Sequence, residues 1–150
     1  KNNKNLIDNI PKENQTYQGM ELLCKTILDP VEENFGKITL TYGFASEDLT
    51  RKIKNRIYPK LDQHSGFEKN KNDEYICSRL GQAVDFIIPK INSKDVCKWI
   101  TLNTSFDRLY FYGDRSPIHV SVGPENKKQI VLMNFIEKYK RYIPRVVKEL

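Results

Sequence analysis

Two histidines and one aspartate are the residues of this chain whose types are best suited to chemistry. The 150 residues contain only two histidines, His64 and His119, and Asp85 lies between them in the apolar run 83–88. Two imidazoles and a carboxylate suit zinc, which takes three protein ligands in catalytic sites and leaves a fourth position for water. Their separations of 21 and 34 residues match no compact metal-binding motif. The sequence therefore predicts a zinc site that depends on the fold to assemble it.

His64 and Asp85 also have simpler interpretations. The polar stretch 62–73 shows no periodicity and predicts a surface loop, in which His64 could be an exposed histidine without a ligand. A carboxylate within an apolar run is costly to bury unpaired, so Asp85 either binds a cation or pairs with Arg79 or Arg108.

A second group of residues could bind an anion. Arg79, Arg108 and Arg115 accompany Tyr110 and Tyr112, and guanidinium groups with aromatic rings can hold a carboxylate, a phosphate or a nucleotide. Ordinary surface ion pairing explains these arginines equally well. The net charge of +6 favours polyanions such as nucleic acid or cell-wall polymers, although interleaved lysines and acids also indicate a solvated surface.

Length and composition predict one domain. We expect residues 1–16 to form a flexible N-terminal arm and residues 17–150 to form a single domain with one core. No apolar run approaches the roughly 18 to 20 residues that cross a bilayer, so no transmembrane segment is predicted. Three cysteines without a CxxC pair favour the reducing cytoplasm, and an extracellular location stays open because the native N-terminus could precede Lys1.

Periodicity and turn signals predict helices and strands in a mixed order. The expected elements are a helix over 19–35 that is redirected at Pro30, a strand over 38–42, a helix from Ser46 to near Pro59, a strand over 83–88, a helix capped by Ser93, strands over 108–112, 118–122 and 129–133, and a C-terminal helix from Asn134. This order predicts an α+β domain with a small, mostly antiparallel sheet and flanking helices.

The last elements carry further expectations. The turn-rich residues 123–126 predict that strands 118–122 and 129–133 are antiparallel neighbours. His119 alternates with its apolar neighbours and should point away from their face, into a cleft or solvent. Apolar residues on the C-terminal helix should pack on the sheet or dock a partner; they are Phe135, Tyr139, Ile143 and Val147.

Four stretches between residues 19 and 133 resemble a known family. Residues 27–31 (ILDPV), 38–46 (ITLTYGFAS), 81–85 (GQAVD) and 118–121 (IHVS) occur in this order. They resemble the opening helix, the I-T-S-G-Y-R-S strand and turn, the tail of S-x-H-x-x-G-x-A-x-D, and a closing strand of the zinc D-alanyl-D-alanine carboxypeptidases. That fold is shared with the Hedgehog signalling domain. The resemblance implies that Asp85 and the histidine of 118–121 bind zinc, and that the substrate is a peptide, such as one of the cell wall.

The chain departs from the family pattern at the third ligand. The motif places its first histidine at position 78, where this chain has Ser78, a poor zinc ligand. His64 follows Asp62 and Gln63 in a phrase that resembles the family's S-Q-H, so its imidazole could take that place. Cys77 is a second candidate, because a thiolate binds zinc well.

The catalytic base also departs from the pattern. Family members have a glutamate near the strand before the last histidine, but residues 110–117 contain none, and Asp114 is the nearest acid. Our leading hypothesis is a divergent zinc-dependent hydrolase of a peptide or amide bond with Asp114 as base. The alternative is a catalytically inactive module of the same fold that binds an anionic ligand or nucleic acid.

Overall fold

The computed structural model describes residues 7–53 and 57–150. Its helical segments are α1 (Asn14–Leu23), the π-helical turn η1 (Cys24–Leu28), α2 (Asp29–Phe35), α3 (Glu47–Lys52), the 3-10 turns η2 (Pro59–Leu61) and η3 (Gln63–Ser65), α4 (Ser93–Asn103) and η4 (Glu137–Tyr139). Its strands are β1 (Thr39–Tyr42), β2 (Gln82–Ile87), β3 (Arg108–Phe111), β4 (Ile118–Val122), β5 (Gln129–Ile136) and β6 (Arg141–Val147). They form a sheet of order β1-β2-β4-β3-β5-β6, antiparallel except between β3 and β5. The predicted α+β class with a mostly antiparallel sheet is confirmed.

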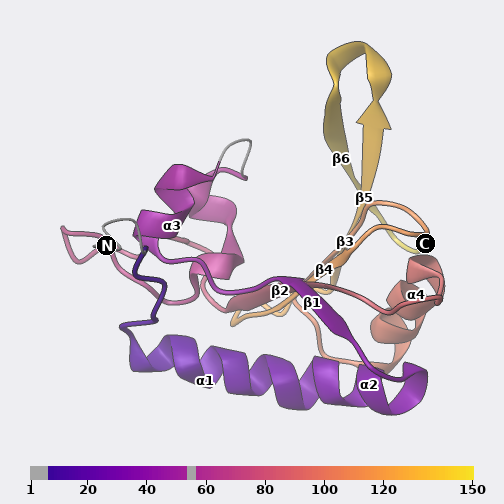
Figure 1. Ribbon diagram of the computed structural model, residues 1–150, viewed down its shortest axis with the longest axis horizontal. Coiled ribbons are helices and arrows are strands. Elements are labelled where there is room, and N and C mark those ends of the chain that lie inside the picture. The colour runs from indigo at the N-terminus through magenta and orange to yellow at the C-terminus, as the bar shows by residue number, and fades with distance from the viewer. Residues whose placement is uncertain (1–6, 54–56) are drawn as a thin grey trace, which may run out of the picture.

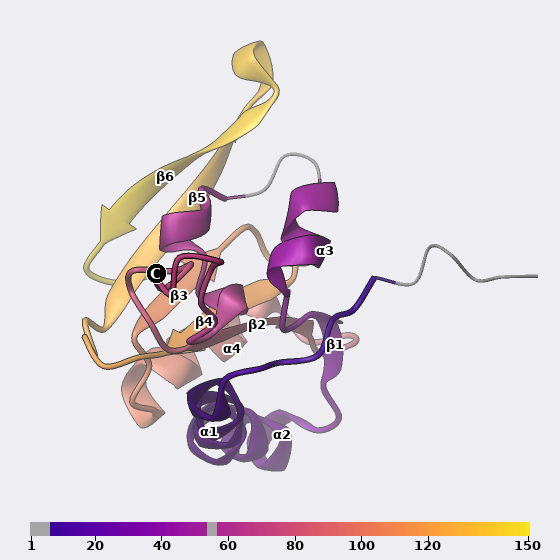
Figure 2. The same cartoon turned by 90° about the vertical axis from the view of Figure 1, so that its left-hand side faces the viewer.

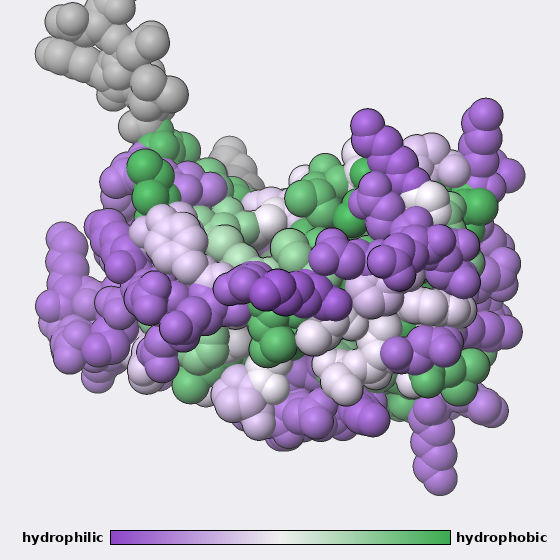
Figure 3. Space-filling view, turned by 90° about the horizontal axis from the view of Figure 1, so that it is seen from below, coloured by the Kyte–Doolittle hydropathy of each residue, from purple (hydrophilic) through white to green (hydrophobic). Residues whose placement is uncertain are grey.

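Helices cover one face of this sheet. Alternation along the strands puts Val84 and Phe86 of β2 and Val120 of β4 on the face that packs against Ile27 and Val31 of the α1–α2 segment. The α1–α2 segment runs below the sheet in Figure 1, with α4 at one end. The outer surface of this layer is mainly hydrophilic (Figure 3), as expected for amphipathic helices that bury one apolar stripe.

The long helix continues through Pro30. The prediction that the helix is redirected at this proline is wrong. A π-helical turn precedes Pro30 instead, in which the N–H of Asp29 bonds to the carbonyl of Cys24. A π turn uses i→i+5 bonds, so the hydrogen-bond ladder shifts by one residue just before Pro30, where the ring has no N–H to donate. The helix therefore spans the sheet without a break.

The next two helices differ slightly from their predicted limits. Ser46 caps α3 as expected, accepting the N–H of Leu49, but Ile53 already has extended backbone, so the helix ends well before Pro59. Part of that predicted helix falls on residues 54–56, which lie outside the described residues. Asn92 rather than Ser93 caps α4. None of the helices among the described residues is long and apolar enough to cross a membrane.

The polar face of the sheet is covered by residues 59–66 instead of a helix. Figure 2 shows α1 and α2 on one side of β1 and β2, with α3 on the other. The predicted surface loop over 62–73 is wrong for its first residues, because Gln63, His64 and Ser65 are all buried. Their burial is stabilised by hydrogen bonds between Gln63 and the sheet, so a polar sequence here does not mean exposure.

Strands 118–122 and 129–133 are not neighbours, contrary to the prediction. Residues 123–128 cross over the end of β3, so β5 pairs in parallel with β3 on its far side. Bonds to Asp107 fix this crossing: its carboxylate accepts the N–H of Lys127, and its carbonyl accepts the N–H of Gln129. A short turn between two strands therefore did not imply that they pair.

The predicted C-terminal helix is wrong, because residues 134–147 belong to a β-hairpin. Strands β5 and β6 pair from Ile130↔Val147 to Ile136↔Arg141, and they extend as a two-stranded ribbon beyond the rest of the sheet (Figure 1). Lys140 adopts the left-handed conformation that closes the turn. Pro144 is tolerated because β6 is an edge strand, where one missing N–H costs little.

The N-terminal segment is held more firmly than predicted. Helix α1 begins at Asn14, inside the expected arm, of which residues 1–6 lie outside the described residues. The buried carboxylate of Glu68 accepts the N–H groups of Lys12 and Glu13 and the hydroxyl of Thr16. Glu68 thereby satisfies the N–H groups of the N-cap residue and of the residue before it, and fixes the boundary of the arm.

Replacement of Glu68 with alanine should destabilise the protein. We expect Glu68→Ala to lower the free energy of unfolding by about 2 to 3 kcal/mol, because buried donors lose their acceptor. Urea denaturation followed by circular dichroism measures this loss. Glu74→Ala, which removes an exposed carboxylate bonded to Asn70, is the matched control. Equal losses of stability in the two variants would show that the hydrogen bonds to Glu68 contribute nothing of their own.

Candidate metal centre

Three side chains from distant parts of the chain meet on the polar face of the sheet. Asp85 of β2 lies directly opposite His119 of β4, and His64 descends onto them from η3. His119 Nδ1 is 2.8 Å from Asp85 Oδ1, and His64 Nε2 is 3.2 Å from both of these atoms. In the described part of the chain, these residues could hold a metal ion.

The tautomer of His64 leaves a lone pair facing this cluster. Its Nδ1 is 2.8 Å from the carbonyl oxygen of Gly43, which can only accept, so Nδ1 carries the proton. In the neutral ring Nε2 is then an acceptor, and it faces the carboxylate of Asp85 and Nδ1 of His119. Three such atoms need positive charge between them, either the proton on His119 Nδ1 or a metal ion.

The spacing of the three atoms matches a tetrahedral metal site. Zinc–nitrogen bonds of about 2.0 to 2.1 Å in a tetrahedron place neighbouring ligand atoms about 3.3 Å apart. The separations between Asp85 Oδ1, His64 Nε2 and His119 Nδ1 are 2.8, 3.2 and 3.2 Å. The triangle therefore has nearly the dimensions of one face of such a site, and small shifts would admit an ion.

Backbone and ring contacts hold both imidazoles in place. The carbonyl of His64 accepts the N–H of Ala45, and the ring of Tyr42 packs 4.4 Å from the ring of His64. The ring of Tyr110 packs 4.7 Å from that of His119. The histidines are 3% and 5% exposed, so neither ring can turn into solvent. A site with fixed ligands binds a metal without a large cost of ordering.

The electrostatics favour the protonation states that metal ligands need. Burial alone would raise the pKa of Asp85, but the hydrogen bond from His119 and the proximity of both imidazoles hold it well below its usual range. Burial lowers the pKa of His119, against the opposing effect of Asp85. Asp85 is therefore ionised and His119 neutral near pH 7, and metal binding does not need to displace a proton from a charged imidazole.

The cluster opens to solvent on the side of Asp85. The side chain of Asp85 is 28% exposed and lines a cavity of about 230 Å³, together with Tyr112, Ser116, Pro117 and Tyr142. Burial, and the nearby charge of Asp85, raise the pKa of Tyr112 above its usual range, so its hydroxyl is a hydrogen-bond donor at neutral pH. A ligand in this cavity would meet both a carboxylate and a phenol.

Asp114, the predicted base, lies elsewhere. It sits in the turn between β3 and β4 and lines a different cavity of about 520 Å³ with Lys90, Asn92 and Arg115. The paired strands carry this turn past the end of the site, because their last pair is Phe111↔Ile118. Within the described residues, no bond joins Asp114 to the three candidate ligands.

The predicted arginine cluster does not assemble. Arg79 donates to Tyr110 Oη and to the carbonyl of Leu61, and Arg108 is buried in ion pairs with Asp107 and Glu125. Of the two alternatives for Asp85, pairing with Arg79 or Arg108 is wrong, since Asp85 pairs with the histidines. Arg115 lines the cavity of Asp114. Of the predicted ligand-binding residues, Tyr112 lines the metal-centre cavity and Tyr110 packs on His119.

A polar network that sequence reasoning missed places His64 over the sheet. The amide of Gln63 donates to Asp107 Oδ2 (2.9 Å) and to the carbonyl of Leu80 (2.7 Å), and it accepts the hydroxyl of Ser121 (2.8 Å). Ser121 shares its strand face with His119, and this alternation was the one available signal. Because His64 follows Gln63 in the chain, these hydrogen bonds also fix the position of the His64 imidazole next to Asp85.

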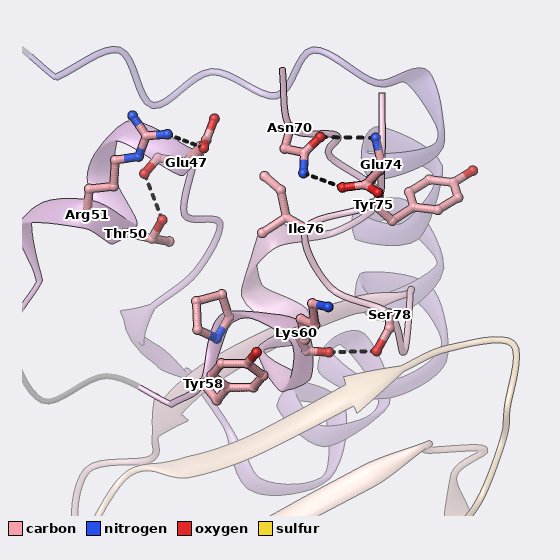
Figure 4. Close-up of a pocket in the computed structure, with 11 residues that line it drawn as sticks. Glu47, Thr50, Arg51, Tyr58, Lys60, Asn70, Glu74, Tyr75, Ile76 and Ser78 are labelled. Carbon is pink, nitrogen blue, oxygen red and sulfur yellow. Dashed lines mark hydrogen bonds and ion pairs between the residues drawn. The ribbon is translucent and has the colours of Figure 1, made fainter. Parts of the chain in front are cut away.

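A further cavity, of about 480 Å³, lies between α3 and residues 70–78 and does not touch the cluster. Figure 4 shows its polar side chains bonded to one another, Arg51 with Glu47 and Asn70 with Glu74. Such mutually satisfied groups do not point to a ligand, and this cavity carries no functional assignment.

Comparisons with known proteins add no family to this description. No protein-family model, no curated protein and no solved structure matches this chain. The resemblance to zinc carboxypeptidases therefore rests on the short motifs alone, and the function has to be argued from the geometry of His64, Asp85 and His119.

Proposed function

We propose that this protein is a zinc-dependent hydrolase of a peptide or amide bond, with His64, Asp85 and His119 as ligands. One observation carries the proposal. Two imidazole nitrogens and a carboxylate oxygen lie 2.8 to 3.2 Å apart, with one side open to a cavity. Catalytic zinc sites have three protein ligands and an open position, whereas structural zinc sites are closed by four.

The choice of zinc rests on the donor set. Imidazole suits zinc, copper, iron and nickel, whereas magnesium and calcium prefer sites built from oxygen. Two nitrogens and one oxygen in a triangle of tetrahedral dimensions fit zinc best. When bound, zinc would lower the pKa of a water molecule to about 7 and polarise the substrate carbonyl.

The residues of the chain supply the remaining functions. Among the described residues that line the 230 Å³ cavity, Asp85 is the only acid, so its second oxygen takes the role of proton acceptor in place of Asp114, as a base that its lowered pKa makes weaker than a free carboxylate. The neutral hydroxyl of Tyr112 faces the same space and can donate a hydrogen bond to the oxygen of the attacked carbonyl.

Two observations support membership of the zinc D-alanyl-D-alanine carboxypeptidase fold. The α+β class with a mostly antiparallel sheet is the one this resemblance implies, and the histidine and aspartate of the matched motifs lie on adjacent strands in register. The proposed third ligand comes from η3, upstream of the motif, so the chain would be a divergent member of that fold.

The hydrolase proposal predicts metal-dependent cleavage of peptides. Protein stripped with a chelator should be inactive toward a random peptide library, and zinc should restore cleavage, read by mass spectrometry of the products. Asp85→Asn should lower kcat/KM by more than about a hundredfold, because it weakens both the ligand and the proton acceptor.

Asp114→Asn is the matched control, since it makes the same chemical change in the neighbouring cavity. It should leave the rate unchanged. Zinc-loaded protein that cleaves no peptide would show that the hydrolase proposal is wrong. Equal losses in the two aspartate variants would show that the base has been placed in the wrong cavity.

A further inference from the structure

The β5–β6 hairpin, which extends beyond the rest of the sheet (Figure 1), presents aromatic rings to solvent. Phe135 of β5 and Tyr142 of β6 lie directly opposite each other, with ring centroids 5.1 Å apart, and are 45% and 43% exposed. Tyr139, in the turn between the two strands, is 54% exposed. Aromatic rings carry large apolar areas, and a group of them left in water on a projecting ribbon indicates a surface that contacts a partner.

A cavity of about 500 Å³ lies beside these rings, toward the hairpin turn. Phe135, Tyr142, Lys140 and Arg141 line it on the hairpin, and Tyr112 lines it on the side of the sheet. Cavities of this size, lined by aromatic rings and a few polar groups, are typical of sites for small ligands. A flat ring of a ligand can therefore stack here with cationic side chains beside it.

The charges of the hairpin are mostly positive and mostly unneutralised. Residues 137–149 contain five lysines and arginines and two glutamates, so they carry three of the six net positive charges of the chain. In the described part of the chain, no carboxylate pairs with Arg141 or Arg145. Lys140 pairs with Glu137, but both side chains are about three-quarters exposed, so this pair is weak. The hairpin therefore attracts an anionic partner.

We propose that the β5–β6 hairpin binds single-stranded nucleic acid. Unpaired bases stack on Phe135 and Tyr142, and phosphate groups pair with Lys140, Arg141 and Arg145. Single strands suit both features, because aromatic rings stack on free base faces and guanidinium forks match phosphate oxygens. A duplex keeps its base faces stacked on one another and would offer only its phosphates. This binding uses none of the three candidate metal ligands, so it does not rest on the proposed hydrolase function.

Other partners fit the hairpin less well. Three of the four residues 137–140 at its tip are charged, and charges are costly to bury in a lipid bilayer. A second copy of the chain would bring like charges together. A strand added to the free edge of β6 would meet Pro144, which has no N–H to donate, and the exposed Arg145; both are residues that protect sheet edges from pairing. A polyanion with flat rings satisfies both the charges and the aromatic side chains.

Fluorescence anisotropy of labelled oligomers tests this proposal on the full chain. Oligothymidine of about 12 nucleotides is compared with an abasic oligomer of the same length, which keeps the phosphates and lacks the bases. The protein should bind oligothymidine at least about fivefold more tightly, because stacking adds to the attraction of the phosphates. Oligouridine of the same length distinguishes RNA from DNA as the source of the strand. Equal affinity for the abasic oligomer and for both base-containing oligomers would overturn the proposal.

Substitutions at Tyr142 test the stacking. Tyr142→Leu should weaken oligothymidine binding about fivefold to a hundredfold and leave the affinity for the abasic oligomer unchanged. Tyr142→Phe keeps the ring and should bind as the wild-type protein does. Tyr17→Leu is the matched control, because Tyr17 of α1 is 48% exposed and lies outside the hairpin. Equal losses in Tyr142→Leu and Tyr17→Leu, or in Tyr142→Leu and Tyr142→Phe, would contradict stacking on this ring.

A double variant tests the charges. Lys140→Gln with Arg141→Gln removes two positive charges beside the cavity, and Lys98→Gln with Arg115→Gln makes the same change in net charge on α4 and in the turn after β3. The logarithm of the binding constant falls with the logarithm of the salt concentration by about 0.7 for each phosphate contact to a single strand, so the hairpin variant should reduce this slope by about 1.4. Equal reductions in the two double variants would show that only the net charge of the protein matters, and would overturn the proposal.

Competition separates nucleic acid from other anionic partners. Polyglutamate and vesicles that contain phosphatidylserine should displace oligothymidine far less well than unlabelled oligothymidine does. Displacement by either of them at the same concentration of charge would overturn the proposal, because the surface would then recognise negative charge alone. If Tyr142→Leu unfolds the hairpin, it also loses the abasic oligomer, and the comparison of the two oligomers on the wild-type protein then decides.

Discussion

Replacement of His64, Asp85 or His119 should abolish tight metal binding, while replacement of Cys77 or Ser78 should not. Each of the first three supplies one atom of the triangle, and a site with two ligands left holds zinc weakly. We expect His64→Ala and His119→Ala to lower zinc affinity by more than about a hundredfold, since even changes to residues that only support ligands cost tenfold to a hundredfold.

Zinc per chain, measured by inductively coupled plasma mass spectrometry after zinc addition and desalting, should be near one for the wild-type protein. Cys77→Ala and Ser78→Ala are the controls, because sequence reasoning offered the first as a ligand and the second at the position of the family's histidine. Both side chains face the carbonyl of Lys60 instead. Zinc retained in His64→Ala and lost in Cys77→Ala would show that the third ligand was assigned to the wrong residue.

Neutralising Asp107 should have the largest effect on stability. Its carboxylate is 1% exposed and accepts from Arg108, from Gln63 and from the N–H of Lys127. Asp107→Asn would leave the buried guanidinium of Arg108 without its buried counter-charge. Breaking a buried ion pair in this way costs about 3 to 5 kcal/mol, and urea denaturation should show a loss of that size in the free energy of unfolding.

Glu125→Gln removes the other carboxylate that pairs with Arg108, which makes it the matched control. Glu125 lies at the surface, with a side chain that is 36% exposed, so we expect a loss below about 1 kcal/mol. Asp107→Asn should also weaken zinc binding about tenfold, because Gln63 loses an acceptor and His64 follows it in the chain. Similar losses of stability in both variants would contradict the assignment of Asp107 as the buried partner.

The pairing of Asp85 with His119 could be predicted from the sequence, but the position of His64 could not. Alternation in two apolar strands put each polar side chain on the face away from the core, and the family resemblance connected them. His64 sits in a short turn without periodicity, and its place depends on side-chain bonds of Gln63 to three distant positions. Contacts of that kind leave no local pattern, so the loop was predicted to be exposed.

The C-terminal segment shows how one pattern can fit two structures. Phe135, Tyr139 and Ile143 recur every four residues, which is typical of a helix, but aromatic and β-branched residues also favour strands. The open edge of β5 decided between them, because residues 141–147 could pair there along their whole length. Pairing partners of this kind are a property of the assembled sheet, and no window of the sequence contains them.

An ion between η3 and the two strands would act as a cross-link between residues 64, 85 and 119. It would join segments that are far apart in the chain, and so restrict the unfolded protein as a disulfide does, while remaining reversible. Folding and metal supply are then linked by mass action: the free zinc concentration becomes a determinant of how much protein is folded, whether or not any substrate is present.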